Sequence, residues 1–238
     1  MKTRILSLRI PLWTPLWFFL PALILSALIA GCSGIPSLGS ETHSRETSLF
    51  DGVSLNGWQG LVANPYQLQN MDDAEKTQLQ TEANEQMRRH WKVEAGVLCF
   101  DGKGSHLVTE HEYGDFELQM EWQITPGGDS GVYLRGCPQV QIWDHLKNPV
   151  GSGGLFNNQK AGATPLEVAD SPLGDWNHFR ILLKADRVTV YLNDRLVVND
   201  TPLENYWRRT EPLPIRGPIE LQSHGTPLKF RNITIREL

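Results

Sequence analysis

The chain has 238 residues, of which 40% are apolar and 21% charged, enough for one sizeable domain with a hydrophobic core. Its 21 Gly, 15 Pro and 8 Trp are spread along the chain, which argues against a collagen-like or disordered protein. The net charge of −5 argues against a nucleic-acid partner, since such proteins usually present a basic face. Three cysteines, none in a C-x-x-C pair, are too few for a disulfide scaffold.

The first 31 residues have the pattern of a secretory signal. Basic residues precede an apolar run over residues 10–30 that is long enough to span a bilayer, so an uncleaved anchor is the alternative. Residues 29–32 resemble the lipobox of bacterial lipoproteins, in which the cysteine is lipidated and becomes the mature N-terminus. The resemblance predicts a lipid anchor on Cys32 and, with Ser33 rather than Asp beside it, an outer-membrane location facing the periplasm.

Three segments follow from this interpretation: a signal peptide over residues 1–31, a lipidated cysteine and flexible tether over residues 32–47, and a domain over residues 48–238. Cys99 and Cys137 would then meet an oxidising compartment that permits a disulfide. Two separate buried thiols are the favoured interpretation.

The domain has the pattern of an all-β fold. Residues 116–124 alternate strictly between apolar and polar side chains, which predicts a half-buried strand. The same pattern, less pure, recurs at residues 131–135, 139–143, 179–184, 187–193, 219–222 and 230–235. Turn signals at residues 184–187 and 193–195 separate neighbouring strands. Many short strands of this kind predict a sandwich of two antiparallel sheets.

One helical insert is expected at residues 71–89. Acidic residues come early and Arg late, and Leu79, Ala83 and Met87 form a narrow apolar stripe. We expect this helix to pack on an edge of the sandwich, and the pattern gives it no catalytic role.

Three predicted strands carry specialised polar side chains opposite their core positions. They place Tyr133 with Arg135, then Gln139 and Gln141 with Trp143, and then Glu220 and Gln222 with His224. An ordinary solvent-exposed face would more often carry Lys, Glu and Thr. Planar amides, an arginine and aromatic rings are instead the groups that bind sugar hydroxyls and ring faces. Taken singly, His224 and Asp129 could serve in turns and Arg135 in a surface ion pair.

Other catalytic motifs are missing from the sequence, including the Gly-x-Ser-x-Gly elbow, His-Glu-x-x-His and the P-loop. Residues 151–154 predict a flexible loop at the rim of the groove, with Asn157 and Lys160 beyond it as further substrate-binding candidates. Glu117 and Glu121 share one strand face four residues apart, as in sandwich-fold glucanases, although their flanking residues do not match.

The order of motifs resembles one family over about residues 48–238. The motifs that carry the resemblance lie at residues 48–52, 55–58, 91–98, 113–118, 128–136, 139–144, 174–177, 219–225 and 230–233. The resemblance is to the 3-keto-disaccharide hydrolase domain, also described as 3-keto-glucoside 1,2-lyase and 3-keto-2-hydroxy-glucal hydratase. It implies a concanavalin A-like jelly roll that cleaves glycosides oxidised to a ketone at C3.

A C3 ketone acidifies the C2 proton, so a base, an enolate-stabilising group and an acid on the leaving oxygen would suffice for elimination. The candidates for the base are His224 or Glu220, with Asp144 as an alternative acid or base and Arg135 as the clamp on the enolate or a sugar oxygen. The predicted substrate-binding residues are Asp129, Tyr133, Gln139, Gln141, Trp143, Asn157, Lys160 and Gln222.

No cofactor is required by this chemistry. A divalent metal held by Asp129, Glu220 and His224 remains open, because carboxylates and imidazole are suitable ligands and the spacing does not demand one. A non-catalytic carbohydrate-binding lipoprotein is the alternative function, since the fold alone never establishes activity. An ordinary glucanase using Glu117 and Glu121 is a third possibility.

Overall fold

The computed structural model describes residues 45–238. The predicted signal peptide, the Cys32 anchor and most of the predicted tether lie outside these residues. Strand β1 (Thr47–Ser48) begins at the last residue assigned to the tether and pairs with the C-terminal strand, Thr47 opposite Ile235. Within the described part of the chain, no helix combines the length and the apolar character needed to cross a membrane.

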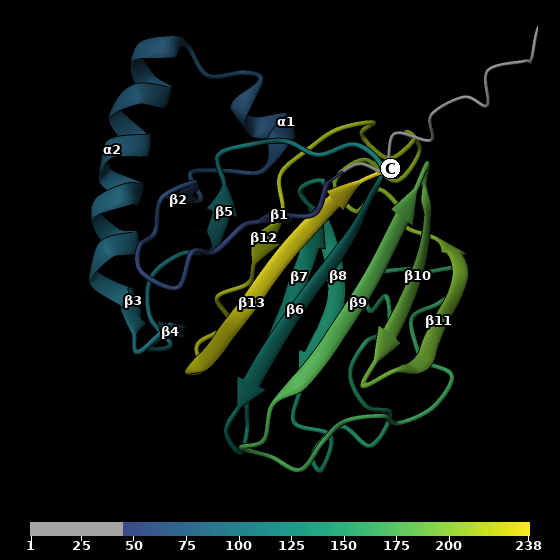
Figure 1. The fold of residues 1–238 in the computed structure, drawn as a ribbon. Coiled ribbons are helices and arrows are strands. Elements are labelled where there is room, and N and C mark those ends of the chain that lie inside the picture. The colour runs from purple at the N-terminus through teal and green to yellow at the C-terminus, as the bar shows by residue number, and fades with distance from the viewer. Residues whose placement is uncertain (1–44) are drawn as a thin grey trace, which may run out of the picture. The chain divides into compact units, whose positions relative to one another are not determined.

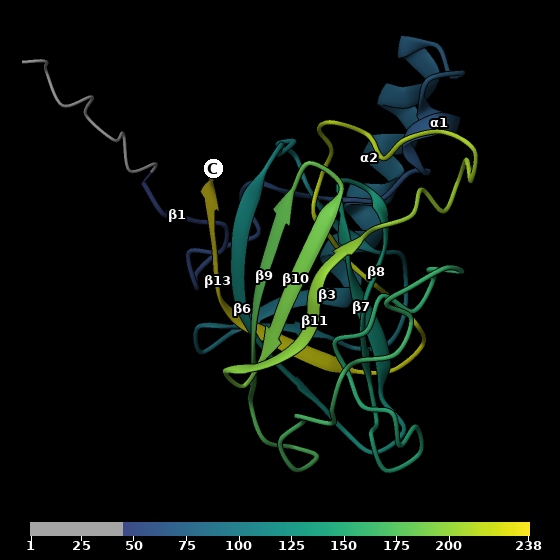
Figure 2. The ribbon, with the colours of Figure 1, turned by 90° about the vertical axis from the view of Figure 1, so that its right-hand side faces the viewer.

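Two antiparallel sheets form the domain, and Figures 1 and 2 show them as two layers. The eight-stranded sheet has the order β11-β10-β9-β6-β13-β4-β3, with β1 added on β13. Its strands are β3 (Trp91–Glu94), β4 (Val97–Phe100), β6 (Phe116–Ile124), β9 (Asn177–Lys184), β10 (Arg187–Leu192), β11 (Arg195–Pro202) and β13 (Leu228–Glu237). The five-stranded sheet has the order β2-β5-β12-β7-β8. Its strands are β2 (Trp58–Gly60), β5 (Leu107–Thr109), β7 (Asp129–Leu134), β8 (Cys137–Trp143) and β12 (Glu220–Leu221).

The core lies between the sheets because alternate side chains of each strand point inward. In β6 every even-numbered residue is buried, including Leu118 and Met120, and every odd-numbered one is half-buried. Val132, Val140 and Leu221 of the five-stranded sheet belong to the same core. The predicted all-β jelly-roll sandwich is therefore confirmed.

The helical insert is also confirmed, as a short helix α1 (Pro65–Leu68) and a longer one, α2 (Asp73–His90). Asp72 caps α2 by accepting from the Glu75 amide, and the predicted stripe contributes one buried residue, Met87. Figure 1 shows α2 along the sandwich edge beside β2 and β3. It approaches so closely that a Cβ at Gly60 would overlap the backbone of Ala83.

Cys99 lies on β4 and Cys137 on β8, and both are free thiols, as favoured from the sequence, but only Cys137 is buried and Cys99 is half-buried. Burial raises the pKa of Cys137 to about 11, so this thiol stays protonated at neutral pH and serves as a small core residue.

Candidate active site

The outward face of the five-stranded sheet carries the predicted polar residues. Strand pairing sets Glu220 between Val108 of β5 and Tyr133 of β7, and all three side chains lie on the face turned away from the core. Two cavities open onto this one face, and we call them the amide cavity and the insert cavity.

The amide cavity has a volume of about 430 Å³, within the usual range for a small-molecule site. It is lined by Asp129, Tyr133, Pro138, Gln139, Gln141, Trp143, Phe156, Asn157, Tyr206, Trp207, Gln222 and His224. Eight of these were predicted from the sequence as site residues, from strands and loops far apart in the chain. The convergence of these eight on one cavity is therefore observed.

A chain of polar contacts leads through this cavity to His224. The side-chain amide of Gln139 donates to Gln141, which in turn donates to Asp129 Oδ1 at 2.8 Å. The other oxygen of Asp129 lies 3.2 Å from His224 Nδ1. A carboxylate at Nδ1 favours the tautomer with its proton there, which leaves Nε2 free to accept a proton. Gln141 has a different role from the hydroxyl contact predicted for it, since its amide group also donates to two backbone carbonyls.

Gln222 and Tyr133 form the buried part of the cavity wall. Gln222 Nε2 donates to the Tyr133 hydroxyl at 3.3 Å, while Gln222 Oε1 is buried without a partner among the described residues. An unpaired buried carbonyl oxygen is costly, so Oε1 is an acceptor that a ligand hydroxyl would satisfy. Burial, with the nearby Glu220 carboxyl, raises the pKa of Tyr133, so its hydroxyl remains a proton donor.

Aromatic rings form another part of the lining. Trp143 meets Phe156 edge to face at 5.2 Å, and Tyr206 meets Trp207 at 4.8 Å. Only Trp143 was predicted. The other three lie on loops, where no strand pattern indicates which way a side chain faces.

Glu220 lies beside the amide cavity and lines the insert cavity instead. Its side chain is 2% exposed, and Oε2 lies 3.4 Å from Nδ1 of His106, a residue that the sequence analysis missed. Desolvation raises the pKa of Glu220, and His106 opposes this effect only in part. The ring of His106 also contacts Tyr133 at 5.2 Å, so the three residues join the two cavities.

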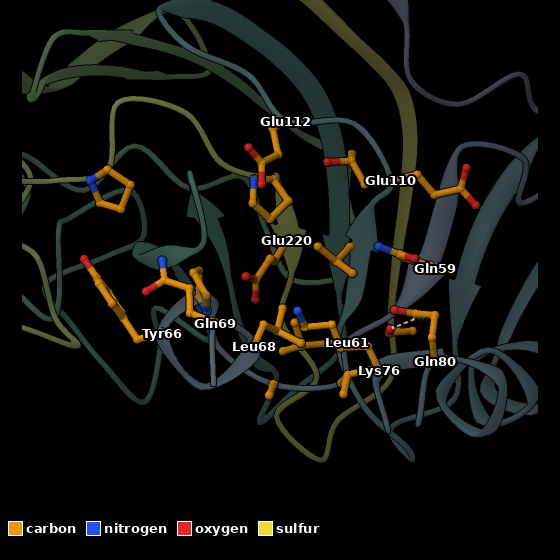
Figure 3. A pocket seen from close by; sticks show the side chains of 18 of the residues that line it. Gln59, Leu61, Tyr66, Leu68, Gln69, Lys76, Gln80, Glu110, Glu112 and Glu220 are labelled. Carbon is orange, nitrogen blue, oxygen red and sulfur yellow. Dashed lines mark hydrogen bonds between the residues drawn. The ribbon is translucent and has the colours of Figure 1, made fainter. Parts of the chain in front are cut away.

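The insert cavity has a volume of about 420 Å³ and lies between the sheet face and the insert. Figure 3 shows Glu220 in its middle, with Glu110 and Glu112 on one side and Leu61 and Leu68 on the other. Residues from β2, β5 and β12 form its floor, and residues from α1 and α2 form its far wall.

Arg135 is not in either cavity, and the prediction of an enolate clamp is wrong. It stands after β7 in a two-residue turn with Gly136, where both φ angles are positive (54° and 70°). Its guanidinium instead donates to Asp115 at 2.7 Å and to the carbonyls of Gly114, Ala185 and Pro214. The turn rotates this side chain away from the face that Tyr133 occupies.

Asp144 and Lys160 also lie outside both cavities. The Asp144 carboxylate accepts from the amides of Gly127, Leu146 and Lys147, and these bonds lower its pKa, which makes it a turn cap rather than a proton donor. Lys160 is exposed, and its backbone amide binds Glu204.

The proposed metal ligands do not come together. Asp129 and His224 share the amide cavity while Glu220 faces the insert cavity, and among the described residues no three His, Cys, Asp or Glu side chains form a group that fits a metal ion. The structure therefore does not support a site made of these three residues.

Glu117 and Glu121 lie on the eight-stranded sheet, away from both cavities. Each is paired with arginine, Glu117 with Arg236 at 2.7 Å and Glu121 with Arg231 at 2.6 Å. The two carboxylates are on the eight-stranded sheet and are held by arginines, whereas both cavities lie on the five-stranded sheet. They cannot act on a substrate in either cavity, which removes the basis for the glucanase alternative.

Comparisons with known proteins identify the family to which the chain belongs. The family described as "3-keto-alpha-glucoside-1,2-lyase-like domain" matches residues 45–236. A 3-keto-disaccharide hydrolase from Bacteroides thetaiotaomicron is 23% identical over 80% of this chain and 78% of its own length. Two crystal structures of proposed glycosyl hydrolases from Parabacteroides distasonis are also similar. One is 27% identical over 81% of this chain and 84% of its own, with a TM-score of 0.56. The other is 26% identical over 77% and 100%, with a TM-score of 0.52. The chain therefore belongs to the 3-keto-alpha-glucoside-1,2-lyase-like domain family.

Proposed function

We propose that this protein cleaves 3-keto-disaccharides by removing the C2 proton and eliminating the glycosidic oxygen. The observation that carries the proposal is His224 at the mouth of the amide cavity, supported by Asp129 and, behind it, Gln141. This is an imidazole base held in one tautomer next to groups that bind sugar hydroxyls. The family membership supplies the substrate class.

His224 is the general base. Its Nε2 takes the C2 proton, the C2–H electrons form a C1=C2 double bond conjugated with the C3 ketone, and the C1–O bond breaks. Asp129 stabilises the imidazolium that forms, as the carboxylate of a catalytic triad does. The side chain of His224 is 57% exposed, so the proton passes to water after the step.

Glu220 is the acid for the leaving oxygen. Because its pKa is raised, the Glu220 carboxyl stays protonated to a higher pH than the carboxyl of an exposed glutamate, as a general acid requires. It lies opposite Tyr133 on the neighbouring strand, at the boundary of the two cavities. His106 is then the source that returns a proton to Glu220.

Tyr133 replaces Arg135 as the group that stabilises the developing enolate. Its hydroxyl accepts from Gln222 and keeps its own proton to donate toward the C3 oxygen, from a side chain that is itself buried. Gln222 Oε1 and the Gln139 amide bind hydroxyls, and Trp143 offers a ring face. Addition of water across C1=C2 of the product would complete a net hydrolysis.

Incubation of the purified protein with a 3-keto-disaccharide tests the proposal. We expect release of one free sugar together with an enone that absorbs in the ultraviolet, and no release from the unoxidised disaccharide. His224→Ala is expected to lower turnover by about 10²–10⁴-fold, the usual contribution of a general base. His178→Ala, on the other sheet, is the control and should retain full turnover. Binding without turnover in the wild type would instead support the non-catalytic carbohydrate-binding alternative.

We also propose that the chain is lipidated on Cys32 in a bacterial envelope and faces the periplasm. The support is the basic start, the apolar run and the lipobox-like residues 29–32. Mass spectrometry of the membrane fraction should find a diacylglycerol-modified cysteine at the mature N-terminus. An unmodified chain that keeps residues 1–31 would contradict it.

A further inference from the structure

We propose that the insert cavity binds the leaving sugar of the disaccharide, so that α1 and α2 make the protein selective for a saccharide over a small aglycone. The inference rests on the proposed function, which places the 3-keto ring in the amide cavity, and it extends that function to the other half of the substrate.

The first observation is that the two cavities are halves of one sheet face. Tyr133 lines the amide cavity, and Glu220, its direct partner on the next strand, lines the insert cavity. Paired strands are about 4.8 Å apart, so the cavities adjoin at the width of one strand. A glycosidic linkage placed over this boundary would put one ring on each side.

The second observation is that the insert is fixed to the sheet at both ends of the cavity. Gln80 Nε2 donates to the Gly60 carbonyl at 2.9 Å, and the Gly60 amide donates to Asn84 at 2.9 Å. At the other end, a Cβ at Gly136 would come within 2.7 Å of Pro65 Cγ. The far wall is therefore rigidly placed, as a binding site requires.

The third observation is the chemistry of the lining. The side chains of Gln59, Gln69 and Glu110 have no hydrogen-bonding partner among the described residues, and they stand beside the apolar Leu61 and Leu68. Amides and a carboxylate bind hydroxyl groups, while the leucines contact the C–H surface of a ring.

The charges of the lining do not favour an ionic ligand. The two basic residues of the lining are paired with carboxylates outside it, Lys76 with Asp73 and Arg216 with Glu237. They equal Glu110 and Glu112 in number, and Glu220 is drawn toward its neutral form. A neutral sugar fits this balance, and a phosphate or a carboxylate ligand does not.

The test compares two substrates that share the 3-keto ring, a 3-keto-disaccharide and methyl 3-ketoglucoside, in the Gln59→Ala/Gln69→Ala double variant. Each lost hydrogen bond is expected to cost a fewfold in affinity, so kcat/KM for the disaccharide should fall about tenfold, mostly through KM. The methyl glycoside should change less than about twofold, because it does not reach the insert cavity. Gln78→Ala, on the exposed side of α2, is the matched control and should change neither.

Equal losses on both substrates, or no loss on the disaccharide, would overturn the assignment. Titration with the unoxidised disaccharide gives a second readout that needs no turnover. Weaker binding by the double variant than by Gln78→Ala supports the site, and equal binding by all three proteins overturns it. If the wild type binds the unoxidised disaccharide more tightly than the double variant does but cleaves neither 3-keto substrate, the proposed function is rejected while the sugar site in the insert cavity stands.

Discussion

Arg135→Met tests whether the arginine stabilises the fold rather than the reaction. Arg135 is 2% exposed and donates four hydrogen bonds, one of them to the Asp115 carboxylate. Methionine keeps much of the side-chain volume but leaves three carbonyl oxygens and one carboxylate without this donor.

Breaking a buried ion pair by removing one partner typically costs about 3–5 kcal/mol. Asp115 is 35% exposed and still accepts from the Ala185 amide, so we expect the lower end of that range, about 3 kcal/mol. For a domain of this size each kcal/mol lowers Tm by about 2–4 °C, which gives a decrease of about 6–12 °C.

Urea and thermal unfolding measure this loss, and turnover is normalised to the folded fraction. The control is Arg187→Met, which removes an exposed pair with Asp200 and should cost less than about 1 kcal/mol. Turnover per folded molecule should stay within about twofold of the wild type in both variants. An Arg135→Met protein with unchanged stability and lost turnover would refute this reasoning and restore Arg135 to the catalytic site.

Two further predictions concern the polar contacts of the site. Burial raises the pKa of Glu220, so its proton is held more tightly in the folded state and wild-type stability falls as pH rises through the folded pKa. Glu220→Gln removes this dependence, so the Tm of the variant relative to the wild type should increase between pH 4 and pH 8; a constant difference would contradict the burial argument. Gln141→Leu removes a donor from Asp129, and the loss of a hydrogen bond to a charged group should lower kcat about tenfold with little change in KM. If KM rises instead while kcat is kept, Gln141 binds substrate and does not position His224.

The alternation of side chains made most of the fold and part of the site predictable. Strand β6 was recognised because its period of two is unbroken, and the same period placed Tyr133, Gln139 and Gln222 on one face. Short strands such as β2 and β5 were missed, since three residues are too few to show a period.

Arg135 shows why that reasoning failed at a strand end. The pairing of β7 with β8 shifts register between Val132 and Leu134, and the chain then enters a turn of positive φ. Both features depend on the partner strand, so extending the alternation by one residue gave the wrong face.

Other site residues depend on contacts that no local pattern encodes. His106 reaches Glu220 across 114 positions of sequence, and Tyr206 and Trp207 enter the amide cavity from a loop. The insert was predicted as a helix on an edge of the sandwich. That it forms a wall of the insert cavity follows only from its packing against Gly60.

Hydrogen exchange at C2 of the substrate in D2O, followed by NMR, tests the roles of His224 and Glu220 most directly. Glu220→Gln lacks the acid for the leaving oxygen, so it should still exchange the C2 proton for deuterium while cleavage nearly stops. His224→Ala lacks the base and should show neither exchange nor cleavage. Exchange that persists in His224→Ala and disappears in Glu220→Gln would contradict the account, because it would make Glu220 the base.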